Sequence, residues 1–190
     1  MSKNLWCIRH GTALHNILGK QIGDIAYTNY TDTPLVKKGE EEALKFGKKW
    51  EKIKTIDIVF VSPLTRTLQT ATNIFNGTDK KLIAIEEIQE YPQGVHYCNK
   101  RKTKTELIKL FPNVDFSLIN EDSKYWQNNV WEGISDLKSR IEMFKKFAKQ
   151  RNETNICIVS HSTFLKQFLY NDIGDIHDGL LHCYPYEYKL

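Results

Sequence analysis

No segment of the sequence approaches the length of a membrane-spanning helix, and the N-terminal residues MSKNLWCIRH contain no apolar stretch of signal-peptide length. Glycine and proline are scarce, at ten and five residues of 190, which excludes a fibrous or low-complexity chain. The net charge of +4 is too small for a dedicated nucleic-acid-binding protein. These absences predict a globular protein of the cytoplasm whose partner is a small anionic molecule, not nucleic acid or a membrane.

The four cysteines lie far apart and form no C-x-x-C pair, so the sequence indicates neither a zinc ribbon nor a redox motif. Cys7 and Cys157 fall inside apolar runs, where a reduced thiol packs as a small hydrophobic group. His177, His182 and Cys183 match no standard metal-ligand spacing and are expected to belong to a C-terminal turn. We therefore expect no metal and no cofactor.

Short apolar runs alternate with helical patterns, which is typical of an α/β sandwich with a mostly parallel central sheet flanked by helices. The expected strands are residues 5–9, 56–62, 81–87, 155–160 and 184–188. A polar loop is expected between the first strand and Thr33. The expected helices begin at Thr33-Pro34, at Ser62-Pro63, near Ile134 and at Ser162, the last running to about Tyr170, with a shorter one at 105–110. Residues 89–133 are the least regular and are predicted to cover the site. We expect residues 1–190 to form one domain.

Polar residues follow several of these strands at the point where each strand ends. Arg9-His10 ends the first strand, Ser160-His161 ends the fourth, and Arg66 lies just beyond the second. Glu90 follows the third strand by a few residues. In a doubly wound sheet ligands bind beyond the carboxyl ends of the strands, so these side chains are expected to meet. The helices after Ser62 and His161 are expected to direct their N-terminal N–H groups into the same place.

Two arginines and two histidines at such a place predict a phosphate site, because guanidinium groups pair with phosphate oxygens through two parallel hydrogen bonds. One imidazole could attack the phosphorus while the other cations hold the equatorial oxygens. A carboxylic acid at the rim could protonate the leaving oxygen and then activate water. This chemistry requires no metal.

Four motifs, taken in order, resemble those of the histidine phosphatase superfamily, also called the phosphoglycerate mutase-like family. RHGTALHN is similar to the family's R-H-G motif, and DTPLVKKGEEEA to its D-x-P-L-x-x-x-G segment. VSPLTRTLQTA resembles the family's S-P-L-x-R-x-x-Q-T-A helix, and IVSHSTFL its second-histidine strand. Four motifs in family order are a strong signal. The resemblance implies the phosphoglycerate mutase-like fold.

The resemblance implies that His10 is the nucleophile that becomes phosphorylated. It also implies that Arg9, Arg66 and His161 complete the phosphate pocket and that Asn16 adds a hydrogen bond. His15 is expected to lie in a loop near the site, without a chemical role.

Among the nearby carboxylates, Glu90 is the favoured proton donor, because Glu86 and Glu87 fall at the end of the strand. Two residues depart from the family pattern: Ser162 stands where glycine is frequent, and Thr12 where an acidic residue or glutamine is common.

The predicted activity is hydrolysis of a phosphomonoester, because phosphoglycerate mutases are longer chains with extra segments around the substrate. Mutase-type phosphoryl transfer and an inactive phosphate-binding interaction module are the alternatives. An RNA-binding domain is disfavoured by the mild charge. Sugar phosphates, nucleotides, inositol phosphates and phosphoproteins all stay open as substrates.

A basic stretch and several aromatic residues lie in the irregular region. YPQGVHYCNKRK resembles a segment of a eukaryotic-type branch of the family, and Lys100, Arg101 and Lys102 are placed to reach a second anionic group. A solvated basic loop is the alternative. The aromatics Tyr125, Trp126 and Trp131 could stack on a base or sugar, or form a small core of the loop.

Overall fold

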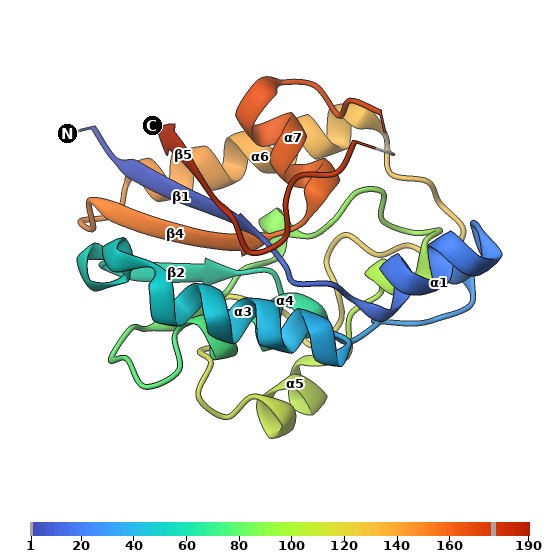
Figure 1. Ribbon diagram of the computed structural model, residues 1–190. Helices are drawn as coiled ribbons and strands as arrows, with labels where there is room; N and C mark the ends of the chain where they lie inside the picture. Colours follow the sequence, from blue (N-terminus) through green and yellow to red (C-terminus); the bar gives the residue numbers. More distant parts are fainter. Residues whose placement is uncertain (1, 176–177) are drawn as a thin grey trace.

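The computed structural model describes residues 2–175 and 178–190, which form a three-layer α/β sandwich (Figure 1). The central sheet has five strands in the order β3-β2-β4-β1-β5. The strands are β1 Asn4–Arg9, β2 Ile58–Val61, β3 Leu82–Ala84, β4 Asn155–Ser160 and β5 Pro185–Lys189. Four strands are parallel, and β5 pairs antiparallel with β1 at the edge. The carboxyl ends of the parallel strands therefore lie at one end of the sheet.

The helices cover both faces of the sheet. They are α1 Leu14–Ile22, α2 Ile25–Thr28, α3 Lys37–Lys49, α4 Thr65–Ile74, α5 Lys104–Leu110, α6 Ile134–Lys149 and α7 Ser162–Tyr170. Three short 3-10 helices span Glu51–Thr55, Glu86–Ile88 and Tyr97–Asn99. Helices α3 and α4 lie on one face and α6 and α7 on the other (Figure 1). None of the helices in the described ranges is long and apolar enough to cross a membrane.

Side chains that point alternately to the two faces of the sheet divide the core into two layers. In β1, Trp6 and Ile8 belong to the cluster under α3 and α4, while Leu5 and Cys7 belong to the cluster under α6 and α7. Successive side chains of a strand point to opposite faces, so a strand that is apolar throughout is covered on both sides. The apolar runs of the sequence identify the parallel strands for this reason.

Several predicted boundaries differ from the structure. The helix expected to begin at Thr33-Pro34 begins at Lys37, and the strands expected over 56–62 and 81–87 are shorter, at Ile58–Val61 and Leu82–Ala84. Residues 11–32 were expected to be a loop, yet they contain α1 and α2. Gly19 lies in α1, and Ala13 at the N-cap makes no side-chain hydrogen bond, so the stretch carries a weak helix signal. The helix expected to begin at Pro63 begins at Thr65, because its capping group comes from a distant residue, Asp32.

Candidate active site

The turn after β1 packs directly on the start of α3, and two motif glycines make this possible. A Cβ on Gly11 would lie 2.5 Å from the Gly39 carbonyl oxygen, and a Cβ on Gly39 would collide with the Thr12 backbone. The Gly11 N–H donates to Thr70 Oγ1 on α4 at 3.0 Å. The backbone after His10 is thus held by two other motifs of the sequence.

This packing predicts the effect of Gly11→Ala. The new methyl group would push the turn away from α3, and overpacking of this kind costs about 1–3 kcal/mol of unfolding free energy. Urea denaturation measures the change, and phosphate release reports the displaced His10. Gly133→Ala is the matched control, because the nearest atoms to its Cβ belong to side chains, Asp136 Oδ2 at 3.1 Å and Ser135 Oγ at 3.4 Å, and not to backbone. Equal stability of the two variants would contradict the prediction.

Asp32 holds the N-terminus of α4. Its carboxylate accepts hydrogen bonds from the Thr65 N–H at 2.8 Å and the Thr65 hydroxyl at 2.6 Å, and it pairs with Lys102 Nζ at 3.1 Å. A carboxylate at a helix N-terminus satisfies N–H groups that lack partners within the helix. The next residue is Arg66, so Asp32 fixes the start of the turn that carries this arginine.

Arg66 is fully buried and reaches the segment after Glu90. Nη1 donates to the Cys98 carbonyl at 2.6 Å and Nη2 to Asn99 Oδ1 at 2.9 Å. Burial lowers the pKa of Arg66, and the negative charge of Glu90 is among the groups that oppose this shift. An arginine still carries its charge at neutral pH, so Arg66 brings a fixed positive charge into the site.

His10 is 1% exposed and has a defined tautomer. Its Nδ1–H donates to the Gly11 carbonyl at 2.7 Å, which leaves the lone pair on Nε2. Burial, followed by the charge of Arg66, holds the pKa of His10 well below 6.5. The imidazole is therefore neutral at pH 7, the form in which Nε2 is a nucleophile.

His161 faces His10 across the site. The two ring centroids are 5.2 Å apart, and His161 Nε2 lies 2.8 Å from Ser62 Oγ at the end of β2. Burial lowers the pKa of His161 well below 6.5, and Arg66 adds to the shift. The ends of β1 and β4 thus bring the rings of His10 and His161 together.

The Arg9 side chain, at the end of β1, contacts the C-terminal segment. Its Nη1 donates to the Leu180 carbonyl at 2.6 Å, and a Cβ on Gly179 would lie 2.5 Å from the same atom. Ser162 accepts the Leu180 N–H at 3.1 Å, so the residue that replaces a family glycine anchors this segment. Burial lowers the pKa of Arg9, and Glu90 opposes that shift.

Glu90 is half-buried at the N-terminus of α7. Its carboxylate accepts hydrogen bonds from the backbone N–H groups of Phe164 at 3.0 Å, Thr163 at 3.4 Å and Tyr91 at 2.9 Å. Asp32 and Glu90 engage N–H groups at the N-termini of α4 and α7, and the expectation that these helix ends also direct N–H groups toward a phosphate stays a prediction. The helix ends place charged residues of the site.

The neighbouring carboxylates Glu86 and Glu87 have structural partners. Glu86 is 3% exposed, forms an ion pair with Arg101 at 2.7 Å and accepts the Lys124 N–H at 2.7 Å. Glu87 accepts a hydrogen bond from the Tyr125 hydroxyl at 3.2 Å. Both lie in the 3-10 helix Glu86–Ile88 and not at the end of β3 as expected, and their bonds to other residues of the protein favour Glu90 as the proton donor.

The basic stretch divides into two kinds of residue. The Arg101 guanidinium is 0% exposed and donates to Glu86 and to backbone carbonyls, and Lys102 pairs with Asp32. The structure therefore corrects the expectation that Arg101 and Lys102 reach a second anion, because their donors hold the fold together. Lys100 Nζ lies 5.7 Å from the centroid of Tyr97 and 5.8 Å from that of Trp126. Its anion contact stays a prediction.

Asn16 and His15 both lie in α1. Asn16 Oδ1 accepts the Ala13 N–H at 3.0 Å, so its oxygen caps the helix, and its role toward phosphate stays a prediction. His15 Nδ1 lies 2.6 Å from Thr33 Oγ1, and its ring centroid is 5.8 Å from that of His10. His15 thus lies in a helix, with its ring near that of His10, and not in a loop as expected.

Two further residues support the site without having been predicted to. His182 Nδ1–H donates to the His10 carbonyl at 2.5 Å, and burial lowers the pKa of His182 to about 4. Arg140 is fully buried in α6, where it pairs with Glu132 at 2.6 Å and donates to the Glu90 carbonyl at 3.2 Å. Arg140 lies three residues after Leu137 and four before Phe144, so helical spacing places it on the inward face.

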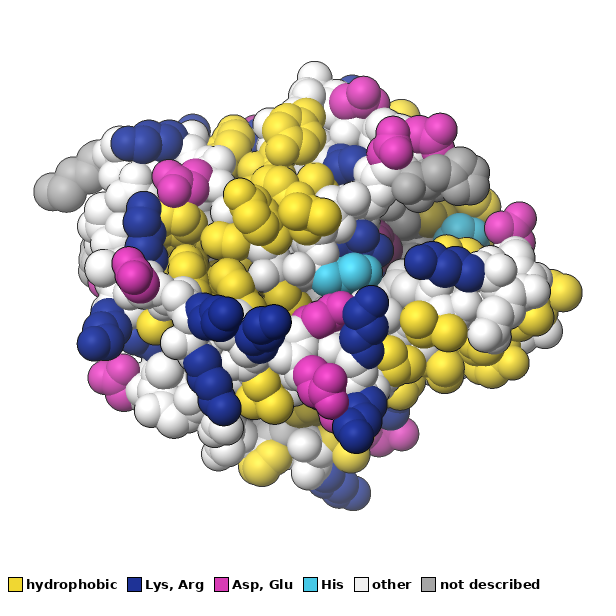
Figure 2. All heavy atoms as spheres, viewed as in Figure 1, with side chains coloured by type: hydrophobic (Ala, Val, Ile, Leu, Met, Phe, Trp, Pro, Cys, Tyr) yellow, Lys and Arg dark blue, Asp and Glu magenta, His cyan; other side chains and the backbone are white. Residues whose placement is uncertain are grey.

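His177, which was expected to belong to a C-terminal turn with His182 and Cys183, lies outside the described residues. Within the described ranges no three His, Cys, Asp or Glu side chains are grouped to hold a metal ion. The face viewed in Figure 2 is hollowed, and histidine and basic side chains gather beside this hollow.

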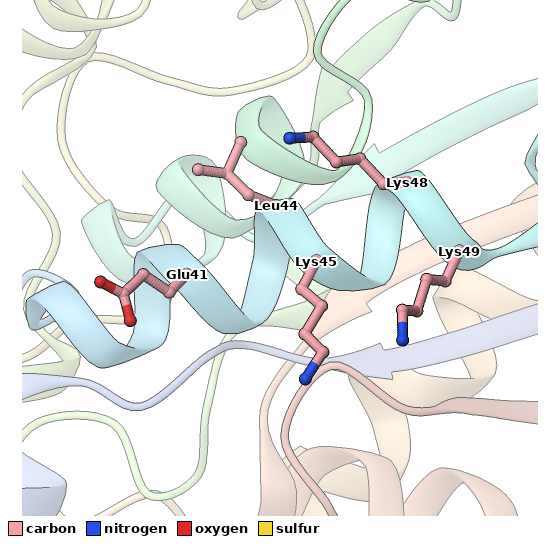
Figure 3. A pocket seen from close by; sticks show the side chains of 5 residues that line it. All are labelled: Glu41, Leu44, Lys45, Lys48 and Lys49. Atoms are coloured by element: carbon pink, nitrogen blue, oxygen red, sulfur yellow. The ribbon is translucent and has the colours of Figure 1, made fainter.

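A separate depression lies on the outer side of α3, away from these residues. It is lined by Glu41, Leu44, Lys45, Lys48 and Lys49. Figure 3 shows that Lys48 points to the opposite side of the helix from Lys45 and Lys49. They offer no common point for an anion, so we place the chemistry at the strand ends.

Comparison with known proteins agrees with this geometry. The family model described as "Histidine phosphatase superfamily (branch 1)" matches residues 5–181. The chain belongs to the histidine phosphatase superfamily. It is 32% identical to "Phosphoglycerate mutase-like protein 1" of Arabidopsis thaliana, over 86% of this chain and 69% of the relative.

Several solved structures share the fold of this superfamily member. A phosphoserine phosphatase from Entamoeba histolytica, solved with 3-phosphoglyceric acid, is 26% identical and has a TM-score of 0.54. That match covers 86% of this chain and 76% of the other. The alpha-ribazole phosphatase from Shigella flexneri is 21% identical, with a TM-score of 0.62 over 95% and 87% of the two chains, and shows the fold alone.

Proposed function

We propose that this superfamily member is a metal-independent phosphatase that hydrolyses a phosphomonoester through a phosphohistidine on His10. The observation that carries the proposal is a set of buried donors with no protein partner among the described residues. Three of them are Arg9 Nε, Arg66 Nε and His161 Nδ1. A buried donor without a partner is costly, and phosphate oxygens would satisfy all three.

In the first half-reaction His10 Nε2 attacks phosphorus. The N–P bond forms as the bond from phosphorus to the ester oxygen breaks, and Glu90 in its acid form gives the leaving oxygen a proton. Arg9, Arg66 and His161 hold the charge on the equatorial oxygens. The Ser62 hydroxyl donates to His161 Nε2, which leaves the Nδ1 proton for the phosphate.

In the second half-reaction water attacks the phosphohistidine. Glu90, now a carboxylate, takes a proton from the water as the new P–O bond forms and the N–P bond breaks. Inorganic phosphate leaves, and His10 returns to its neutral form with Nδ1–H still donating to the Gly11 carbonyl. The side-chain amide of Asn16 would add a further hydrogen bond to the phosphate.

The proposal is tested by phosphate release from a panel of phosphomonoesters in the presence of a chelator. We expect turnover by the wild type that survives the chelator and is abolished by His10→Ala. Turnover that the chelator removes, or that His10→Ala retains, would contradict the proposal. Absence of turnover from folded protein would favour the mutase or the inactive binding module.

The buried histidines also predict how stability depends on pH. Burial holds the pKa values of His10, His15 and His161 well below 6.5, the ordinary value to which they return on unfolding. Below pH 6.5 the unfolded chain therefore binds more protons than the folded one, and the unfolding free energy falls as pH falls. Above pH 6.5 this contribution is fully present.

Urea denaturation between pH 7.5 and 5.5 measures this dependence. We expect a midpoint that is constant near pH 7.5 and falls toward pH 5.5, with a smaller fall in His15→Gln. Equal midpoints at the two ends of the range would contradict the prediction.

A further inference from the structure

A row of neighbouring rings leads from His10 to the surface. The ring centroids are 5.8 Å apart for His10 and His15, 5.7 Å for His15 and Tyr27, 5.5 Å for Tyr27 and His96, and 5.6 Å for His96 and Trp131. Exposure rises along the row, from 1% at His10 and 5% at His15 to 57% at Trp131. We call Tyr27, His96 and Trp131 the ring row.

The inner part of the ring row lies within electrostatic reach of the site. The charges of Arg9 and Glu90 both act on the pKa of Tyr27, and burial is the main cause that raises it. Burial lowers the pKa of His96, and the negative charge of Glu90 opposes this shift. The ring row therefore begins beside the groups that would bind the phosphate and protonate the leaving oxygen.

The structure fixes the two ends of the ring row. A Cβ on Gly19 of α1 would lie 3.0 Å from the Tyr27 hydroxyl, so this helix carries a glycine where the ring passes. A glycine inside a helix costs up to about 1 kcal/mol relative to alanine, so the close approach has an energetic cost.

At the outer end, hydrogen bonds join the segment that contains Trp131 to the segment that follows Glu90. The Glu132 N–H donates to the Gln93 carbonyl at 3.2 Å, and the Gln93 N–H donates to Glu132 Oε2 at 3.0 Å. Gly94, with φ +90°, accepts the Asn129 N–H at 2.9 Å. The chain on both sides of Trp131 is therefore tied by hydrogen bonds to the segment that follows Glu90.

Trp131 differs from the other tryptophan of the same segment. Trp126 is half-buried, its ring lies 5.4 Å from Tyr97, and its Nε1–H donates to Asn128 Oδ1 at 2.7 Å. Trp126 thus fits the alternative of a small core within the loop. Trp131 is more than half exposed, which a core role does not explain.

We propose that the ring row binds a flat aromatic or heteroaromatic ring in the alcohol part of the substrate. This inference rests on the proposed function and narrows the substrate class to phosphomonoesters that carry such a ring. Stacking on aromatic faces contributes beyond the apolar area that is buried, and the His96 and Trp131 rings offer such faces. The phosphate would lie at His10 and the ring of the leaving group at the ring row.

Three esters with similar leaving groups test the inference: ethyl phosphate, 2-cyclohexylethyl phosphate and 2-phenylethyl phosphate. We expect kcat/KM to be about tenfold higher for the phenyl compound than for ethyl phosphate, with the cyclohexyl compound between them. Trp131→Ala and His96→Ala are expected to remove most of this preference while turnover of ethyl phosphate stays within twofold. Trp126→Ala is the matched control and is expected to keep the preference.

The outcomes separate this inference from the proposed function. Turnover of all three esters that depends on His10, with equal kcat/KM, would overturn the ring row and leave the phosphatase intact. An equal loss of preference in Trp126→Ala would also overturn it. If no ester is hydrolysed, calorimetric binding of 2-phenylethylphosphonate against ethylphosphonate decides the question, and a phenyl preference that Trp131→Ala removes would support the ring row.

Discussion

Glu90→Gln is expected to lower kcat/KM for alkyl phosphates by about 10²–10⁴-fold, the usual contribution of a positioned general acid. The amide keeps the size of the side chain at the N-terminus of α7 but cannot give the leaving oxygen a proton. For 4-nitrophenyl phosphate the loss in the first half-reaction should be far smaller, because this leaving group departs without protonation. The dependence on leaving group is the signature of an acid, since a merely structural residue would affect all esters equally.

Glu87→Gln is the matched control for this prediction. Glu87 lies three residues before Glu90, and its partners are the Tyr125 hydroxyl at 3.2 Å and Lys124 Nζ at 3.4 Å. We expect less than a threefold effect on any ester. A uniform loss in Glu90→Gln across leaving groups, or an equal effect in Glu87→Gln, would show that the proton donor is elsewhere.

Arg140→Ala is expected to destabilise the fold by about 3–5 kcal/mol, the cost of removing one partner of a buried ion pair. The variant would leave the Glu132 carboxylate buried without its partner at 2.6 Å. It would also remove donors from the carbonyls of Glu87 at 2.8 Å and Gln89 at 2.6 Å. These carbonyls belong to the segment that carries Glu90, so we expect activity to fall at temperatures where the variant is still folded.

Urea denaturation of Arg140→Ala beside Arg151→Ala checks this prediction. Arg151 pairs with Glu153 at 2.6 Å, but its side chain is 34% exposed, and exposed ion pairs contribute no more than about 1 kcal/mol. Similar losses in the two variants would contradict the role of Arg140. A stable Arg140→Ala with full activity would do so as well.

The sequence predicted the sheet well because the fold buries both faces of its parallel strands. A strand that is covered on both faces is apolar throughout, as in the IVFV of β2. A polar residue directly after such a strand therefore stands out in the sequence. His10 and His161 were predicted from this pattern, and the structure brings their rings to 5.2 Å. Helix α7 was predicted with the bounds that the structure shows, Ser162–Tyr170.

The errors concern groups whose partners are distant in the sequence. Asp32 caps α4 from 33 residues away, so no local pattern at Ser62-Pro63 could show that the helix begins at Thr65. Arg101 belongs to a basic stretch whose charge predicts an anion site, yet it forms an ion pair with Glu86 in the interior. Charge alone does not distinguish a free cation from a buried ion pair, because both use the same residue types.

The central claim is that phosphate passes through His10, and trapping the intermediate tests it most directly. Glu90→Gln, incubated with 4-nitrophenyl phosphate, should form the phosphohistidine and then hydrolyse it slowly, because no carboxylate activates the water. We predict a burst of nitrophenol and protein-bound phosphate that is stable in base, labile in acid and mapped to His10 by mass spectrometry. Phosphate on another residue, or turnover without any phosphorylated protein, would contradict the account.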